Sequence, residues 1–168
     1  MIEKTKVKIE RQQRAAEIIT LLKEYAPKVL VEYPVELAYL YGSMARGCPL
    51  PMSDVDIALV LAEILPAYER LTLELKIQAA LEDACHLANL DVRSINQAPL
   101  MVQGEIIQEG VLLYSRDKDR RIAFEILTRK KYFDYLPTSM RMEQTFLDRI
   151  RQQGLSRGQA KNTHFNSE

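Results

Sequence analysis

Two aspartates, Asp54 and Asp56, stand two positions apart at the start of the apolar run VDIALV. In a strand, side chains two positions apart point to the same face, so both carboxylates would lie side by side while Val55 and Ile57 point the other way. Carboxylates that close repel each other and raise at least one pKa, and a cation between them removes that cost. Oxygen ligands select a hard ion, so the pattern predicts magnesium held together with water and substrate phosphates.

The chain just before these aspartates carries residues suited to phosphate. Gly42 lets the backbone come close to a bulky anion and point N–H groups at it. Ser43 adds a hydroxyl donor at the start of a helical turn, and the planar guanidinium of Arg46 suits phosphate oxygens. Ser53 is expected to assist without direct contact. An anion cradle followed by metal-binding carboxylates predicts a nucleoside triphosphate site; the alternative is an ordinary Gly-Ser turn followed by two solvated aspartates.

These residues also carry a family resemblance. Gly42-Ser43, ten intervening residues and Asp54-x-Asp56 resemble the signature of the minimal nucleotidyltransferases, the smallest members of the DNA polymerase β-like superfamily. The segments GSMARG and SDVDIALV are similar to the MNT antitoxin group, whose members pair with HEPN-domain ribonuclease toxins. The resemblance covers roughly residues 35–115, whereas the terminal helices match only in general plan.

The resemblance implies a third carboxylate on the strand beside the paired one. Asp91, in Leu90-Asp91-Val92, matches that position, although a lone aspartate at a strand start is by itself more often a turn or cap residue. As the third acid, Asp91 would hold a metal ion and act as the general base. Arg93 would share its face and either pair with Asp91 or meet phosphate.

What the resemblance implies about function is transfer of AMP from ATP to a tyrosine hydroxyl of a cognate HEPN toxin, with two Mg²⁺ ions held by the three aspartates. Two other readings stay open: an antitoxin that acts by binding alone, with a vestigial nucleotide site, and a nucleotidyltransferase for small molecules such as aminoglycosides. Direct nucleic-acid binding is not expected, because 23 basic residues are balanced by 23 acidic ones.

The hydrophobic pattern of the whole chain predicts an α/β (α+β) fold, with a small mixed sheet of about four strands flanked by helices. Pro27 is expected to end a helix and Pro137 to break or kink one. Ser115 is expected to cap a helix and Gly110 to follow another. The expected strands are 35–41, 54–61, 90–95 and 111–114. The expected helices are 6–26, 66–87 (stopped by Asn89), 100–109, 116–135 and 138–151.

The chain of 168 residues, 47% of them apolar, is long enough for one domain, expected over 1–151 with its core at 35–115 and a polar, flexible tail at 152–168. No apolar run reaches membrane-spanning length, and the two cysteines lack metal-type spacing, so a cytoplasmic protein with reduced thiols is expected. In the predicted C-terminal helix, Met142, Phe146, Leu147 and Ile150 form an apolar stripe. Met140, Met142, Phe146 and Leu147 could dock a partner, but core packing is the use that we favour from sequence.

Overall fold

The computed structural model describes residues 2–50 and 53–153. It divides into two compact units, Met1–Tyr132 and Phe133–Glu168. Gln152 and Gln153 form the last described helical positions, and the rest of the predicted tail lies outside the described residues. Within the described part of the chain, no helix is both long enough and apolar enough to cross a membrane.

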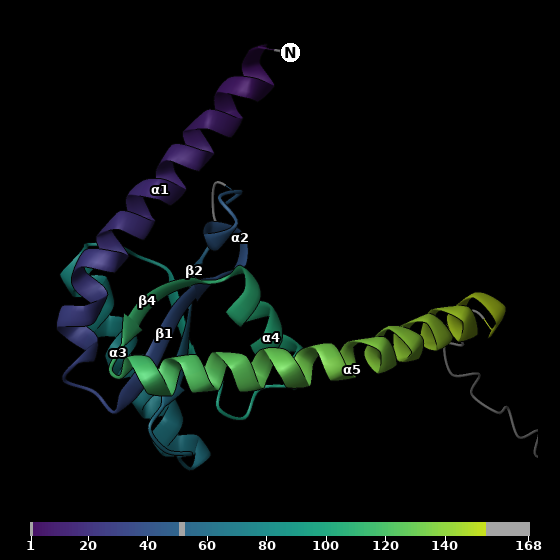
Figure 1. The fold of residues 1–168 in the computed structure, drawn as a ribbon. Coiled ribbons are helices and arrows are strands. Elements are labelled where there is room, and N and C mark those ends of the chain that lie inside the picture. The colour runs from purple at the N-terminus through teal and green to yellow at the C-terminus, as the bar shows by residue number, and fades with distance from the viewer. Residues whose placement is uncertain (1, 51–52, 154–168) are drawn as a thin grey trace, which may run out of the picture. The chain divides into compact units, whose positions relative to one another are not determined.

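The first unit is built on a four-stranded mixed sheet with the strand order β3-β2-β1-β4 (Figure 1). β1 pairs antiparallel with both β2 and β4, whereas β2 pairs parallel with β3. The predicted mixed sheet of about four strands is therefore confirmed. The strand bounds are β1 Val35–Tyr41, β2 Val55–Leu61, β3 Leu90–Ser94 and β4 Val111–Ser115.

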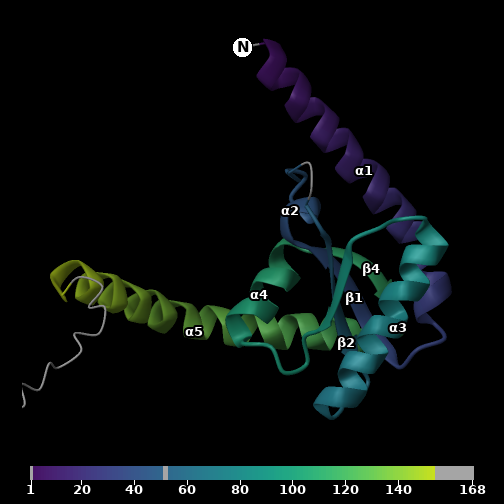
Figure 2. The ribbon, with the colours of Figure 1, turned by 180° about the vertical axis from the view of Figure 1, so that it is seen from behind.

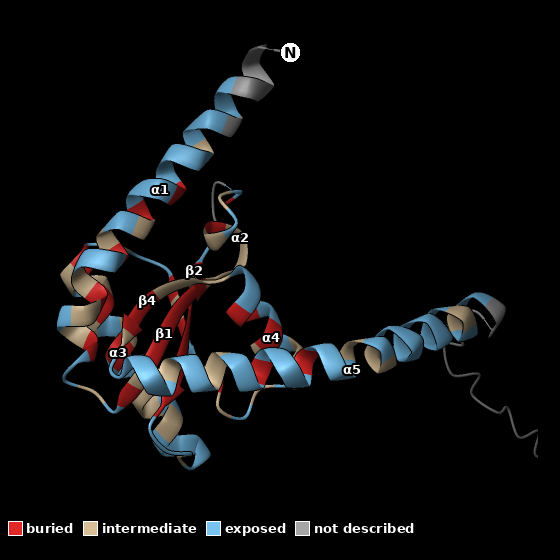
Figure 3. Ribbon diagram, viewed as in Figure 1, coloured by how far each residue is buried: buried red, intermediate tan, exposed pale blue. Residues whose placement is uncertain are grey.

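Helices cover both faces of this sheet. Leu22 of α1 and Ile77 of α3 share one buried cluster with Ile57 of β2, and Ile106 of α4 shares a second with Tyr39 of β1 and Ala58 of β2. Figures 1 and 2 show α3 on one side of the sheet and α4 on the other, and the strands between them are largely buried (Figure 3). The helix bounds are α1 Ile2–Leu30, α2 Gly42–Ala45, α3 Ala67–Cys85, α4 Leu100–Glu109 and α5 Lys118–Gln153.

Neither proline ends a helix, contrary to the sequence prediction. Pro27 lies inside the last turn of α1, where Ala26 and Leu30 are both fully buried and hold the turn against the core. Pro137 lies inside α5, so the two predicted C-terminal helices are one. The proline ring fixes φ near the helical value, and at the exposed Pro137 water can hydrate the carbonyl that loses its partner.

Three predicted helix ends also differ in detail. Ser115 ends β4, and the helix cap is Asp117, whose Oδ1 accepts a hydrogen bond from the Arg120 N–H at 2.9 Å. α3 ends at Cys85 because His86 adopts the left-handed conformation, with φ 52°, ahead of the predicted stop at Asn89. Gly110 follows α4 as predicted but in extended backbone, and glycine fits there because a Cβ would collide with the Ile106 carbonyl oxygen.

The described part of the second unit is the later portion of α5. Its large apolar side chains face solvent: Met140, Met142 and Phe146 are each 61% exposed and Leu147 is 40% exposed. The preference for core packing of this stripe was wrong, because no other described element of this unit is available to cover it.

Candidate active site

Three polar side chains form a row across the ends of three strands. Tyr41 of β1 is in register with Asp56 of β2, and Asp56 is in register with Asp91 of β3. Residues opposite each other on neighbouring strands share a face, and neighbouring strands lie about 4.8 Å apart. The sheet therefore brings Asp56 and Asp91 together, as the sequence prediction requires. Asp54 lies one residue before β2, so this strand begins later than predicted.

The acids of this row influence one another's ionisation. The pKa of Asp56 is raised, first by partial burial and then by the negative charges of Asp91 and Asp54, while Arg46 opposes the rise. The pKa of Tyr41 is raised by burial, Asp56 and Asp91. Burial is the larger cause of both shifts, and the neighbouring carboxylates add to it, a contribution that a cation would relieve.

The bend at Gly42 faces this acidic row. Gly42 has φ +73°, a conformation that side chains rarely adopt, and a Cβ there would collide with the Asp56 carboxylate. The following single turn, α2, carries Ser43, whose carbonyl accepts a hydrogen bond from the Cys48 N–H at 3.0 Å. The Gly42 backbone therefore lies against the Asp56 carboxylate, and phosphate binding by Gly42 and Ser43 stays a prediction.

Arg46 reaches across to α4 instead of standing free. Its Nη1 lies 3.2 Å from Glu109 Oε2, and both side chains are 57% exposed. A cavity of about 100 Å³ lies beside this pair, lined by residues that include Tyr41, Gly42 and Ile106. A phosphate approaching Arg46 would compete with Glu109 for the guanidinium. Because this ion pair is largely solvated, breaking it costs little.

Ser53 closes the loop that leads into the aspartates. Its hydroxyl accepts a hydrogen bond from the Leu50 N–H at 2.7 Å, and its own N–H donates to the Leu50 carbonyl at 3.0 Å. The structure thus places Ser53 in loop geometry, one residue before Asp54, and its predicted assistance to nucleotide binding stays a prediction.

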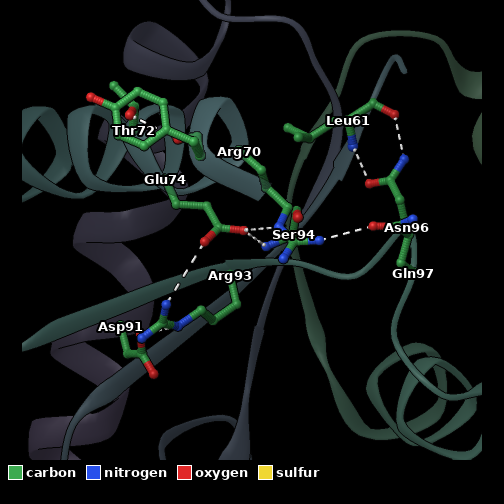
Figure 4. Close-up of polar contacts among 10 residues, drawn as sticks. Leu61, Arg70, Thr72, Glu74, Asp91, Arg93, Ser94, Asn96 and Gln97 are labelled. Atoms are coloured by element: carbon green, nitrogen blue, oxygen red, sulfur yellow. Dashed lines mark hydrogen bonds and ion pairs between the residues drawn. The ribbon is translucent and has the colours of Figure 1, made fainter. Parts of the chain in front are cut away.

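The acids suit a divalent cation in kind, but their present positions do not form a complete site. Among the described residues, no three acidic, histidine or cysteine side chains converge closely enough to hold a metal ion. Asp91 is instead paired with Arg93, whose Nε lies 2.8 Å from Asp91 Oδ1 (Figure 4). Of the two roles open to Arg93, pairing with Asp91 is the one observed.

Sequence reasoning missed two acids that shape the site. Glu109 pairs with Arg46, and no sequence pattern indicates that contact because 63 positions separate the two. Glu74 of α3 is only 5% exposed and contacts Arg93. A signal for Glu74 did exist: it lies three positions before Ile77, on the apolar face of its helix, where an acid needs a partner.

Fold and site together define a class of protein. Residues 17–119, more than half of the chain, match the family model described as polymerase beta, nucleotidyltransferase. The chain belongs to this family of polymerase β-like nucleotidyltransferases, as the sequence signature indicated.

The proteins that the chain resembles include a named adenylyltransferase and chains of solved toxin–antitoxin structures. Over 122 residues the chain is 27% identical to protein adenylyltransferase MntA of Shewanella oneidensis, covering 73% of this chain and 79% of the relative. A solved toxin–antitoxin structure with AMP-PNP is similar with a TM-score of 0.57 at 22% identity, over 77% of this chain and 98% of that one. A chain of the complex of tri-AMPylated Shewanella oneidensis HEPN toxin with MNT antitoxin is similar with a TM-score of 0.54 at 21% identity, over 79% of this chain and 98% of that one. These structural likenesses support the fold.

Proposed function

We propose that this protein is an antitoxin-type adenylyltransferase that moves AMP from ATP to a tyrosine hydroxyl of a cognate HEPN ribonuclease toxin. The observation that carries the proposal is the contact between the Gly42 bend and Asp56, with Asp91 in register on the next strand. An anion cradle directly against paired acids is the arrangement that phosphoryl-group transfer needs. The relative that is named an adenylyltransferase supports the choice of reaction.

The reaction is an in-line substitution at the α-phosphorus. The acceptor oxygen forms a bond to that phosphorus, the bond to the β-phosphate bridging oxygen breaks, and pyrophosphate leaves. Gly42 and Ser43 bind the β- and γ-phosphates through backbone N–H groups and the hydroxyl, and Arg46 exchanges Glu109 for a phosphate oxygen. Asp91 accepts the proton of the attacking hydroxyl.

Asp54, Asp56 and Asp91 would hold Mg²⁺, most simply two ions, which supply charge stabilisation at the attacking and leaving oxygens. The acids' contribution is to gather negative charge at the ends of the strands, where burial first and then the charges of Asp91 and Asp54 raise the pKa of Asp56. The toxin is the expected partner. The exposed apolar side chains of α5, such as Met142 and Phe146, offer a surface for it.

The test is incubation of the purified protein with ATP labelled at the α-phosphate, Mg²⁺ and the toxin, followed by intact mass spectrometry. We expect the toxin to gain whole AMP units on tyrosine, and the Asp56→Asn variant to add none. A toxin that is neutralised without any label would favour the binding-only antitoxin instead. Label on an aminoglycoside, with none on the toxin, would favour the small-molecule enzyme.

A further inference from the structure

A buried glutamate, Glu74, shares the partner Arg93 with the third acid of the site, Asp91. Glu74 Oε1 accepts a hydrogen bond from the Ser94 N–H at 2.8 Å, and Arg70 Nε lies 3.8 Å from the same oxygen (Figure 4). The side chain of Glu74 is only 6% exposed. Because a buried carboxylate is costly unless it keeps hydrogen bonds and positive partners, these contacts fix Glu74 in place.

Arg93 lies between this fixed carboxylate and Asp91. Its Nε is 2.8 Å from Asp91 Oδ1, while its Nη1 is 3.8 Å from Glu74 Oε2. The first distance is that of a hydrogen-bonded ion pair, and the second is longer than a hydrogen bond. Arg93 is 55% exposed and Asp91 43% exposed, so both side chains have room to change partners, whereas Glu74 does not.

We propose that Arg93 is a positioning residue that occupies Asp91 until a divalent cation binds, and then transfers to Glu74. This inference rests on the proposed function, because it assumes that Asp91 becomes a metal ligand. The guanidinium on Asp91 Oδ1 and a divalent ion compete for the same carboxylate and repel each other, so binding of the ion favours the departure of Arg93. Glu74 Oε2 is the acceptor already beside it, and it keeps the displaced charge paired.

The two residues therefore have opposite effects on cation binding. Arg93 competes with the ion for Asp91, so its removal strengthens binding. Glu74 receives the displaced guanidinium, so its neutralisation leaves Arg93 with Asp91 alone and weakens binding. A purely structural role for either residue predicts no such opposition.

The experiment is Mn²⁺ titration of the full chain, with free ion measured by electron paramagnetic resonance, with and without a non-hydrolysable ATP analogue. We expect Arg93→Gln to lower the Kd for Mn²⁺ roughly two- to fivefold, which is the scale of a half-exposed ion pair. Glu74→Gln, which keeps an acceptor for the Ser94 N–H, is expected to raise the Kd by a similar factor. Circular dichroism checks that each variant is folded.

The matched control is Arg120→Gln. Arg120 also pairs with a glutamate, Glu36, at 3.7 Å and lies beyond the other end of β1, so it carries the same charge change without touching Asp91. Equal effects of Arg93→Gln and Arg120→Gln would overturn the proposal in favour of net charge. Tighter binding by Glu74→Gln would also overturn it.

Asp56→Asn separates this inference from the function on which it rests. If Asp56→Asn abolishes Mn²⁺ binding while Arg93→Gln leaves the Kd unchanged, the role of Arg93 is wrong and the proposed metal site stands. If neither the wild type nor any variant binds Mn²⁺, with or without the analogue, the proposed metal site and the role of Arg93 both fail.

Discussion

At the scale of single residues, the geometry of the site depends on the absence of a Cβ atom at Gly42. Gly42 brings its backbone so close to the Asp56 carboxylate that the smallest side chain would collide with it. The same residue has a positive φ, so two separate constraints select glycine at one position. Gly47, a few residues later, has φ +68° but nothing within 4 Å of its missing Cβ, so it is subject to only one of them.

This contrast gives the first prediction. Gly47→Ala is expected to lower the free energy of unfolding by about 1 kcal/mol, the cost of a left-handed non-glycine residue. Gly42→Ala should cost clearly more, since it adds the collision with Asp56, and should also weaken ATP binding. Urea denaturation and nucleotide titration of both variants provide the measurement. Equal costs would mean that the contact with Asp56 is relaxed in solution.

The second prediction concerns the charge of Asp56. The pKa of Asp56 in the folded protein is raised above the ordinary 3.8. At pH values between 3.8 and this raised pKa, the folded protein binds more protons than the unfolded chain. Stability therefore increases as the pH falls through this window and is lowest above it, when Asp56 is ionised. In metal-free buffer at pH 7, Asp56→Asn should be more stable than wild type, with a flatter pH profile and no AMP transfer.

Thermal unfolding from pH 3.5 to 8 in the presence of a chelator, compared with the exposed Asp134→Asn of equal charge change, tests this sign. Loss of stability in Asp56→Asn at pH 7, or transfer at the wild-type rate in magnesium, would contradict it.

At the scale of elements, the exposed edge of β3 is held by carboxylates from α3. β3 ends the sheet, and its outward N–H groups would otherwise have no strand to bind. Glu82 Oε1 accepts from the Leu90 N–H at 3.1 Å, just as Glu74 accepts from Ser94. The pairing fixes the strand that carries Asp91 from both ends, so α3 contributes to the site without entering it.

The third prediction follows from this edge. Glu82→Ala removes the acceptor of the Leu90 N–H and should lower the free energy of unfolding by about 1 kcal/mol, the net contribution of one hydrogen bond. Hydrogen exchange should speed up at the Leu90 amide and stay slow at the Ser94 amide, which Glu74 still holds. Glu82→Gln, which keeps a carbonyl acceptor, is the control. Unchanged exchange at Leu90 in Glu82→Ala would show that the contact contributes nothing.

At the scale of the whole molecule, the two compact units differ in what they contain. The first contains the sheet and the candidate site. The second presents large apolar side chains to solvent, and monomeric proteins seldom leave such side chains together without use. The solved toxin–antitoxin chain with AMP-PNP is covered over 98% of its length by 77% of this chain, so this protein has residues beyond that shared part.

The fourth prediction places the toxin on this exposed stripe. Phe146→Glu is expected to weaken capture of the cognate toxin at least tenfold while leaving the free energy of unfolding nearly unchanged, because the side chain is already solvated. Affinity measured by biolayer interferometry, beside the melting temperature, separates the two effects. Gln144→Glu, an exposed change of equal charge on the same helix, is the control. Toxin binding equal to that of wild type would remove α5 from the interface.

Local pattern was enough to predict the sheet, most element bounds and the family. Strand alternation predicts that Ile57 and Asp56 point to opposite faces of the sheet, and Ile57 is indeed in the core. The spacing from Gly42 to Asp56 is the family signature. Both are properties of a short stretch of sequence. Local rules failed at Pro27, where burial of Ala26 and Leu30 in the core outweighs the tendency of proline to end a helix.

Tertiary structure alone decided which charges face one another. The register of β2 with β3 sets Asp56 beside Asp91, the packing of α3 buries Glu74 behind Arg93, and the packing of α4 gives Arg46 the partner Glu109. An ion pair between residues dozens of positions apart has no periodicity in sequence. The charge that a metal ion or a phosphate would meet at the candidate site is therefore fixed by the packed fold, whereas the acids that would attract a metal ion can be recognised in the sequence.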